Sequence, residues 1–147
     1  MAADPRAESV PASSPAGSSG LSAVTTSAAP APVGPYNQAV QAGGFLFCSG
    51  QIALDPATGA MVGAGDVEAE TRQVLANLQA VLAAAGTTPQ QVVRTTVFLA
   101  DLADFARVNA LYSEVFGAGV SPARACVEVA ALPKGARVEI DCIAYLA

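Results

Sequence analysis

The 147-residue chain contains no histidine and no tryptophan, and only 13% of its residues are charged. The absence of histidine removes the side chain that most often transfers protons near neutral pH. Without histidine or clustered thiols, a dedicated transition-metal site is not expected. Acid–base chemistry in this protein therefore has to rely on other side chains, with the carboxylates first among them.

Cysteine is also scarce, and the three that are present share no close spacing. Cys48, Cys126 and Cys142 are odd in number, form no CxxC pair and fall in segments typical of strands. This pattern predicts buried, reduced thiols in a cytoplasmic protein, without a disulfide framework.

Long apolar runs and basic patches are missing as well. No stretch reaches 18 consecutive apolar residues, so a membrane span is not predicted. The formal net charge is -5 and the seven basic residues are scattered, which argues against binding of nucleic acid. The hydrophobic fraction of 52% is nevertheless high for one isolated domain, which favours an apolar interface between subunits.

Residues 1–20 are rich in Ala, Ser, Pro and Gly and show no periodicity, so they are predicted to be a flexible extension. They also lack the basic start and apolar centre of a secretory signal. Residues 21–147 are long enough for one domain.

The remaining pattern predicts a mixed sheet with two helices. Strands are expected at 39–41, 45–52 and 92–100, followed by a strand pair within 121–141, and helices at 66–85 and from Asp101 or Asp104 to Phe116. Each helix has a single apolar face, so both are expected on one face of the sheet. The other face would then be open, and apolar residues on it would favour homo-oligomerisation. The residues expected on this open face are Phe45, Phe47, Val97 and Leu99.

The segment 121–141 carries the most informative polar residues. Strand alternation places Arg124 and Cys126 on the same side of one strand, and Glu139 lies on the strand that follows the turn. If Arg124 and Glu139 converge on one pocket, a guanidinium and a carboxylate are available for chemistry. The alternative is a structural ion pair between neighbouring strands.

Four positions have both a functional and a structural interpretation. Gly50, inside a strand, marks either a bulge or a ligand that approaches the backbone closely. Tyr36 follows Gly-Pro and either covers a turn or faces a pocket, and Asn109 either is idle on its helix or directs its amide at a partner. Cys126 beside Arg124 is either a nucleophile, or oxidation sensor, with a favoured thiolate or a small side chain lining a pocket.

Several segments together resemble the RidA (YjgF/YER057c/UK114) family over about residues 25–147. They are GPYNQAV (34–40), FLFCSGQIALDPATG (45–59), ETRQVLANLQAVLAAAG (70–86), VVRTTVFLADLADFARVNALY (92–112) and PARACVEVAALPKGARVEID (122–141). The resemblance implies a chorismate-mutase-like α/β (α+β) fold, assembled as a homotrimer with clefts between subunits. It also implies an enamine/imine deaminase that acts on a small imino or enamino acid and needs no cofactor.

The resemblance also implies roles for individual residues. In the family, the residue corresponding to Arg124 binds the substrate carboxylate, and the one corresponding to Glu139 positions the attacking water. Tyr36, Gly50, Asn109 and Cys126 correspond to pocket positions. Asn37, in contrast, stands where many members have serine, which bears on substrate preference.

The function expected from the resemblance is hydrolysis of 2-imino acids, such as 2-iminobutanoate and 2-iminopropanoate, to 2-oxo acids and ammonia. The alternatives left open are a translation-inhibitor-type endoribonuclease, a holdase chaperone and a protein that senses carboxylates without turnover. The acidic composition and the lack of histidine weigh against RNA cleavage.

Overall fold

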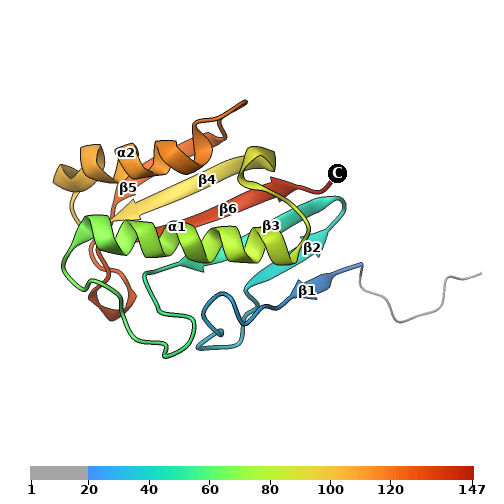
Figure 1. The fold of residues 1–147 in the computed structure, drawn as a ribbon, viewed down its shortest axis with the longest axis horizontal. Helices are drawn as coiled ribbons and strands as arrows, with labels where there is room; N and C mark the ends of the chain where they lie inside the picture. Colours follow the sequence, from blue (N-terminus) through green and yellow to red (C-terminus); the bar gives the residue numbers. More distant parts are fainter. Residues whose placement is uncertain (1–19) are drawn as a thin grey trace, which may run out of the picture.

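The computed structural model describes residues 20–147, which form one mixed sheet covered by two long helices on one face (Figure 1). The strand order is β1-β2-β3-β6-β4-β5, and every neighbouring pair is antiparallel except β4 and β5. The strands are β1 (Ser22–Val24), β2 (Ala39–Ala42), β3 (Phe45–Gln51), β4 (Val92–Leu99), β5 (Ala123–Glu128) and β6 (Val138–Tyr145). Apart from Gly20, the extension expected over residues 1–20 lies outside the described residues.

The predicted helices and their placement are confirmed. Helix α1 (Val67–Ala84) begins where the Asp66 carboxylate accepts hydrogen bonds from the backbone N–H groups of Glu68 and Ala69. Helix α2 (Phe105–Phe116) lies beside α1 on the same face of the sheet (Figure 1). Short 3-10 helices lie in the connections between the longer elements, at Pro89–Gln91, Leu102–Asp104 and Pro133–Gly135. Within residues 20–147, no helix is both long and apolar enough to cross a membrane.

The hydrophobic core lies between the helices and the sheet. Alternate residues of β6 point into it, so Val138, Ile140, Cys142 and Ala144 are all buried. Burying each large aliphatic side chain stabilises the fold by roughly 1.5–3 kcal/mol. Because β6 has neighbours on both sides and helices above it, its other row of side chains is held firmly on the open face of the sheet.

The prediction for the open face was right for the phenylalanines and wrong for β4. Phe45 and Phe47 are 39% and 46% exposed, whereas Val97 and Leu99 are 2% and 0% exposed and lie under the helices. Apolar or β-branched residues occupy most positions in both alternating rows of β4. The sequence therefore does not show which row faces the helices and which faces the open side of the sheet. The alternation of burial instead places Phe98 on the open face, between Glu139 on β6 and Val127 on β5.

One further element was missed. Strand β1 pairs with β2 at the edge of the sheet, although the first strand expected from the sequence begins at residue 39. A three-residue edge strand is too short to show periodicity.

A buried charge cluster fixes the backbone just before β6. Asp104 is 2% exposed, and its Oδ2 accepts hydrogen bonds from Nη2 and Nε of Arg137 at 2.6 and 3.2 Å. These bonds, and the contact with Arg107, hold the pKa of Asp104 below its usual value. The fully buried Glu70 accepts a further bond from the backbone N–H of Arg137 at 3.0 Å. The start of β6, including Glu139 two residues later, is therefore held in a defined position.

Candidate functional site

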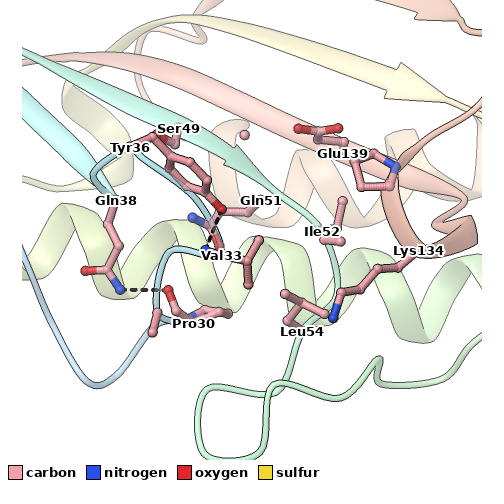
Figure 2. A pocket seen from close by; sticks show the side chains of 13 residues that line it. Pro30, Val33, Tyr36, Gln38, Ser49, Gln51, Ile52, Leu54, Lys134 and Glu139 are labelled. Carbon is pink, nitrogen blue, oxygen red and sulfur yellow. Dashed lines mark hydrogen bonds between the residues drawn. The ribbon is translucent and has the colours of Figure 1, made fainter.

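Glu139 projects from the open face of β6 into a cavity of about 400 Å³ at the end of β3 (Figure 2). Most of the cavity wall is apolar, and its polar side chains come from β3, β6, the segment before β2 and the 3-10 helix Pro133–Gly135. The lining residues are Pro30, Ala31, Val33, Tyr36, Gln38, Ser49, Gly50, Gln51, Ile52, Leu54, Pro133, Lys134 and Glu139. A mostly apolar hollow with a few polar groups is typical of a small-molecule site.

Gly50 makes room for the Glu139 carboxylate. A Cβ atom at this position would overlap Oε1 of Glu139, so any side chain here would displace the carboxylate. The register of β3 against β6 also shifts between Cys48 and Gln51, so a bulge is present as well. The bulge considered from the sequence is therefore present, and the space beside the glycine is occupied by the Glu139 carboxylate. Close approach of a ligand to the backbone here stays a prediction.

The environment of Glu139 disfavours its charged form. The carboxyl is half-buried, and burial raises its pKa above the ordinary value, with the negative charge of Asp141 raising it further. Asp141 lies two residues along on the same face of β6, where it accepts a hydrogen bond from the backbone N–H of Thr96 at 3.2 Å. A carboxyl with a raised pKa can accept a proton more readily near neutral pH than an ordinary one.

An Asp141→Asn substitution is expected to lower the pKa of Glu139, because it removes the negative charge while the amide oxygen can still accept from Thr96. The pKa should remain above the ordinary glutamate value, since burial is the larger cause. Titration of the Glu139 carboxyl carbon by NMR measures the effect directly. An unchanged or higher pKa in the variant would contradict the assignment.

The cavity wall formed by residues 26–36 is held by one buried glutamine. The Gln38 amide oxygen accepts from the backbone N–H of Thr26 at 2.7 Å, and its nitrogen donates to the carbonyl oxygens of Thr26, Ala29 and Pro30. Tyr36, 48% exposed, lines this wall and accepts a hydrogen bond at its hydroxyl from Val33 N–H at 3.3 Å. Figure 2 shows the tyrosine ring over the end of the cavity remote from Glu139.

Arg124 lies elsewhere, on the edge strand β5 beside α2. Its Nη1 donates to Oδ1 of Asn109 at 2.8 Å, and its guanidinium carbon lies 4.8 Å from the ring centroid of Tyr112 and 5.5 Å from that of Phe105. The Tyr112 hydroxyl is in turn 2.7 Å from the Thr95 hydroxyl. The amide of Asn109 is therefore directed at Arg124, and the guanidinium is held in place while most of its donors bind no other group within residues 20–147.

Arg124 and Glu139 do not meet within one chain. Arg124 is in register with Thr95, whose side chain faces the helices, whereas Glu139 is in register with Phe98 on the open face. Arg124 lines a separate hollow of about 420 Å³ that contains Asn109 and Tyr112. No ion pair joins the two charged residues anywhere in the described part of the chain. Their convergence in one pocket stays a prediction that requires a second copy of the chain.

Cys126 follows Arg124 on the same side of β5 and packs against the core. Burial raises the pKa of its thiol, and the nearby Arg124 charge only partly offsets this. The thiol is thus largely protonated near neutral pH, which disfavours the nucleophile hypothesis. Cys126 is not among the residues that line the Glu139 cavity or the hollow beside Arg124, so its place in a pocket stays a prediction.

Sequence reasoning missed three residues that the structure places at these two sites. Tyr112 follows Asn109 by three positions, so helical spacing alone could have suggested that both reach Arg124. Gln51 and Lys134 line the Glu139 cavity. Gln51 directly follows Gly50, and Lys134 lies within the turn between the two strands predicted in 121–141. In the described range 20–147, no three His, Cys, Asp or Glu side chains gather where they could hold a metal ion.

Comparisons with known proteins give a consistent result. A family model described as Endoribonuclease L-PSP matches residues 26–146. A RutC family protein of Synechocystis is 59% identical over 123 residues, covering 84% of this chain and 95% of the relative. A 2-iminobutanoate/2-iminopropanoate deaminase of Salmonella typhimurium is 50% identical over 123 residues, covering 82% and 94%. The crystal structure of the YjgF gene product of E. coli superposes with a TM-score of 0.79 at 45% identity, covering 84% of this chain and 98% of that one.

Proposed function

Because this chain belongs to the endoribonuclease L-PSP family, which includes the RidA/YjgF proteins, we propose that it is a cytoplasmic deaminase of reactive 2-imino acids. It hydrolyses compounds such as 2-iminobutanoate and 2-iminopropanoate, and their enamine tautomers, to 2-oxo acids and ammonia without a cofactor. The observation that carries the proposal is the half-buried Glu139, its pKa raised, facing a cavity in a protein 50% identical to a deaminase of this name.

Arg124 binds the substrate carboxylate. A planar guanidinium offers two parallel N–H donors that match a carboxylate, which a lysine ammonium cannot do. Asn109 and the Tyr112 ring hold the guanidinium in one orientation before the substrate arrives. Less conformational freedom is then lost on binding, and the imine carbon is brought to a defined position.

Glu139 activates the attacking water. As the water oxygen bonds to the carbon of the protonated imine, one water proton passes to the Glu139 carboxylate, and a neutral carbinolamine forms. The protonated carboxyl then gives this proton to nitrogen. The C–N bond breaks as the carbinolamine hydroxyl becomes the carbonyl of the 2-oxo acid, its proton passes back to the Glu139 carboxylate, and ammonia leaves. A carboxyl whose pKa is raised toward neutrality is suited to these proton transfers.

The complete site is proposed to form between identical chains in a homotrimer. Arg124 and Glu139 lie on opposite faces of the sheet, so a second copy is needed to bring one toward the other. The open face also exposes large apolar side chains, including Phe47 at 46%, Val127 at 41% and Tyr145 at 49%. Association through this face would remove these side chains from water and enclose the cavity.

A coupled assay tests the proposed activity. Threonine and a pyridoxal-phosphate dehydratase generate 2-iminobutanoate, and ammonia release is followed above the rate in buffer alone. The proposal predicts acceleration in proportion to protein added. A rate equal to the blank at every protein concentration would leave the proposal without support.

The family model's description as an endoribonuclease raises RNA cleavage as a rival. The carboxylates of Glu139 and Asp141 both lie on the open face of β6, and the net charge of the chain is -5. Two carboxylates would repel a phosphate backbone, and the chain has no histidine for acid–base cleavage. These observations favour a small substrate with one carboxylate.

A further inference from the structure

The cavity beside Glu139 is larger than the simplest substrates require. Its volume of about 400 Å³ falls in the range of pockets that enclose drug-sized ligands, whereas 2-iminopropanoate carries only a methyl group as its side chain. Within one chain, space therefore remains beside Glu139 for a longer substrate side chain, and the polar groups on the cavity wall determine which side chains fit.

One polar side chain on this wall has no hydrogen-bond partner among the described residues. Gln51 is only 7% exposed, yet no hydrogen bond within residues 20–147 involves its side-chain amide. Within the described range, every fully buried polar side-chain atom has a hydrogen-bond partner. The unbonded amide atoms of Gln51 are therefore not fully buried, and their exposed surface faces the cavity that Gln51 lines. Gln38, in contrast, uses both ends of its amide to hold the wall, and the Ser49 hydroxyl donates to the Asn37 carbonyl.

The position of Gln51 indicates that its amide contacts the side chain of the substrate and not the imine carbon that reacts. Gln51 is in register with the buried Ile140, and Glu139 is the neighbouring residue that projects to the other face of β6. The cavity lies where β3 ends, at Gln51, and both Gln51 and Glu139 line it. Figure 2 shows Gln51 near Tyr36, across the cavity from Glu139.

We propose that the Gln51 amide is a hydrogen-bonding subsite for the substrate side chain, so that the protein favours 2-imino acids with a carboxamide side chain over alkyl isosteres. This inference rests on the proposed deaminase function. An alkyl side chain in the cavity would displace water from the Gln51 amide and leave it unpaired, whereas a carboxamide would pair with both its donor and its acceptor. The expected preference is about ten- to a hundredfold in kcat/KM.

The 2-imino acids derived from asparagine and leucine provide the test, because their side chains have nearly the same size and shape. An amino-acid oxidase generates both in situ, and their hydrolysis is measured with wild type, Gln51→Met and, as a control, Gln79→Met on the exposed face of α1. Wild type and the control should prefer the asparagine-derived imine, and Gln51→Met should lose that preference. Equal turnover of both imines by wild type, or the same ratio in all three proteins, would overturn the inference while leaving the deaminase function standing.

A binding measurement separates the subsite from catalysis. The stable 2-oxo acids 2-oxosuccinamate and 4-methyl-2-oxopentanoate are titrated into labelled protein while the side-chain NH₂ signals of Gln51 are followed by NMR. The inference predicts that 2-oxosuccinamate shifts these signals and binds more tightly, and that Gln51→Met removes the difference. If neither imine is hydrolysed but this binding preference is seen, the deaminase proposal fails and the subsite stands; if backbone signals of the cavity move while the Gln51 NH₂ signals do not, the subsite is wrong.

Discussion

Replacing Arg124 with alanine is expected to lower kcat/KM for 2-iminobutanoate by at least about a hundredfold. Each hydrogen bond between a charged donor and a carboxylate is worth about 1.5–3 kcal/mol, and the variant also loses the group that orients the imine carbon. The loss should appear in both KM and kcat, because Arg124 is proposed to bind the substrate and to position it. Steady-state kinetics above the uncatalysed rate measure both parameters.

Two matched variants separate the shape of the guanidinium from its charge. Arg124→Lys keeps the charge but lacks the planar fork and its bond to Asn109, so most of the loss is expected to remain. Arg72→Ala removes an exposed arginine whose contact with Glu114 is 3.9 Å long, and it should leave kcat/KM unchanged. Full activity in Arg124→Ala would show that the carboxylate is bound by another group.

Replacing Glu139 with glutamine is expected to lower kcat by roughly 10²- to 10⁴-fold, the usual contribution of a positioned general base. Glutamine has nearly the same shape and fits beside Gly50, but it cannot accept the proton of the attacking water. KM should change little, since Glu139 is not proposed to bind the carboxylate. Glu114→Gln, with an exposed side chain on α2, is the matched control.

The pH profile of the wild type gives a second view of the same residue. Glu139 must be ionised to accept a proton, so activity should fall as the pH drops through its pKa. Because burial and Asp141 raise this pKa, the acid limb should lie at higher pH than for an ordinary carboxyl, and Asp141→Asn should move it to lower pH. An acid limb unaffected by Asp141→Asn would mean that another group controls the rate.

The sequence was sufficient for the fold because its local signals agree with one another. Asp66 caps α1 as its position suggested, and the single apolar face of each helix places both helices on one side of the sheet. The faces of β4 were assigned wrongly because apolar or β-branched residues occupy both of its rows. Only the pairing with β5 and β6 fixes which row lies under the helices.

The sequence carries signals at individual residues of the candidate site, and it does not contain the geometry that relates them. Gly50 and Asn109 carry sequence signals, and the structure gives each a partner, Glu139 and Arg124 respectively. Arg124 and Glu139 lie on opposite faces of the sheet because of the registers in which β5 and β6 pair with β4. No local sequence pattern contains these registers. The sequence could not predict that the Gln51 amide is unpaired, because an unpaired group is recognised only once the hydrogen bonds of all its neighbours are known.

The central claim is that Arg124 of one chain and Glu139 of another complete each site. Mixing Arg124→Ala with Glu139→Gln, after unfolding and refolding them together, tests it most directly. In trimers assembled at random from equal amounts, about a quarter of the sites receive both intact residues, so activity should recover to about a quarter of wild type. If mixed trimers form and remain as inactive as either variant alone, the two residues do not act across an interface and the account is wrong.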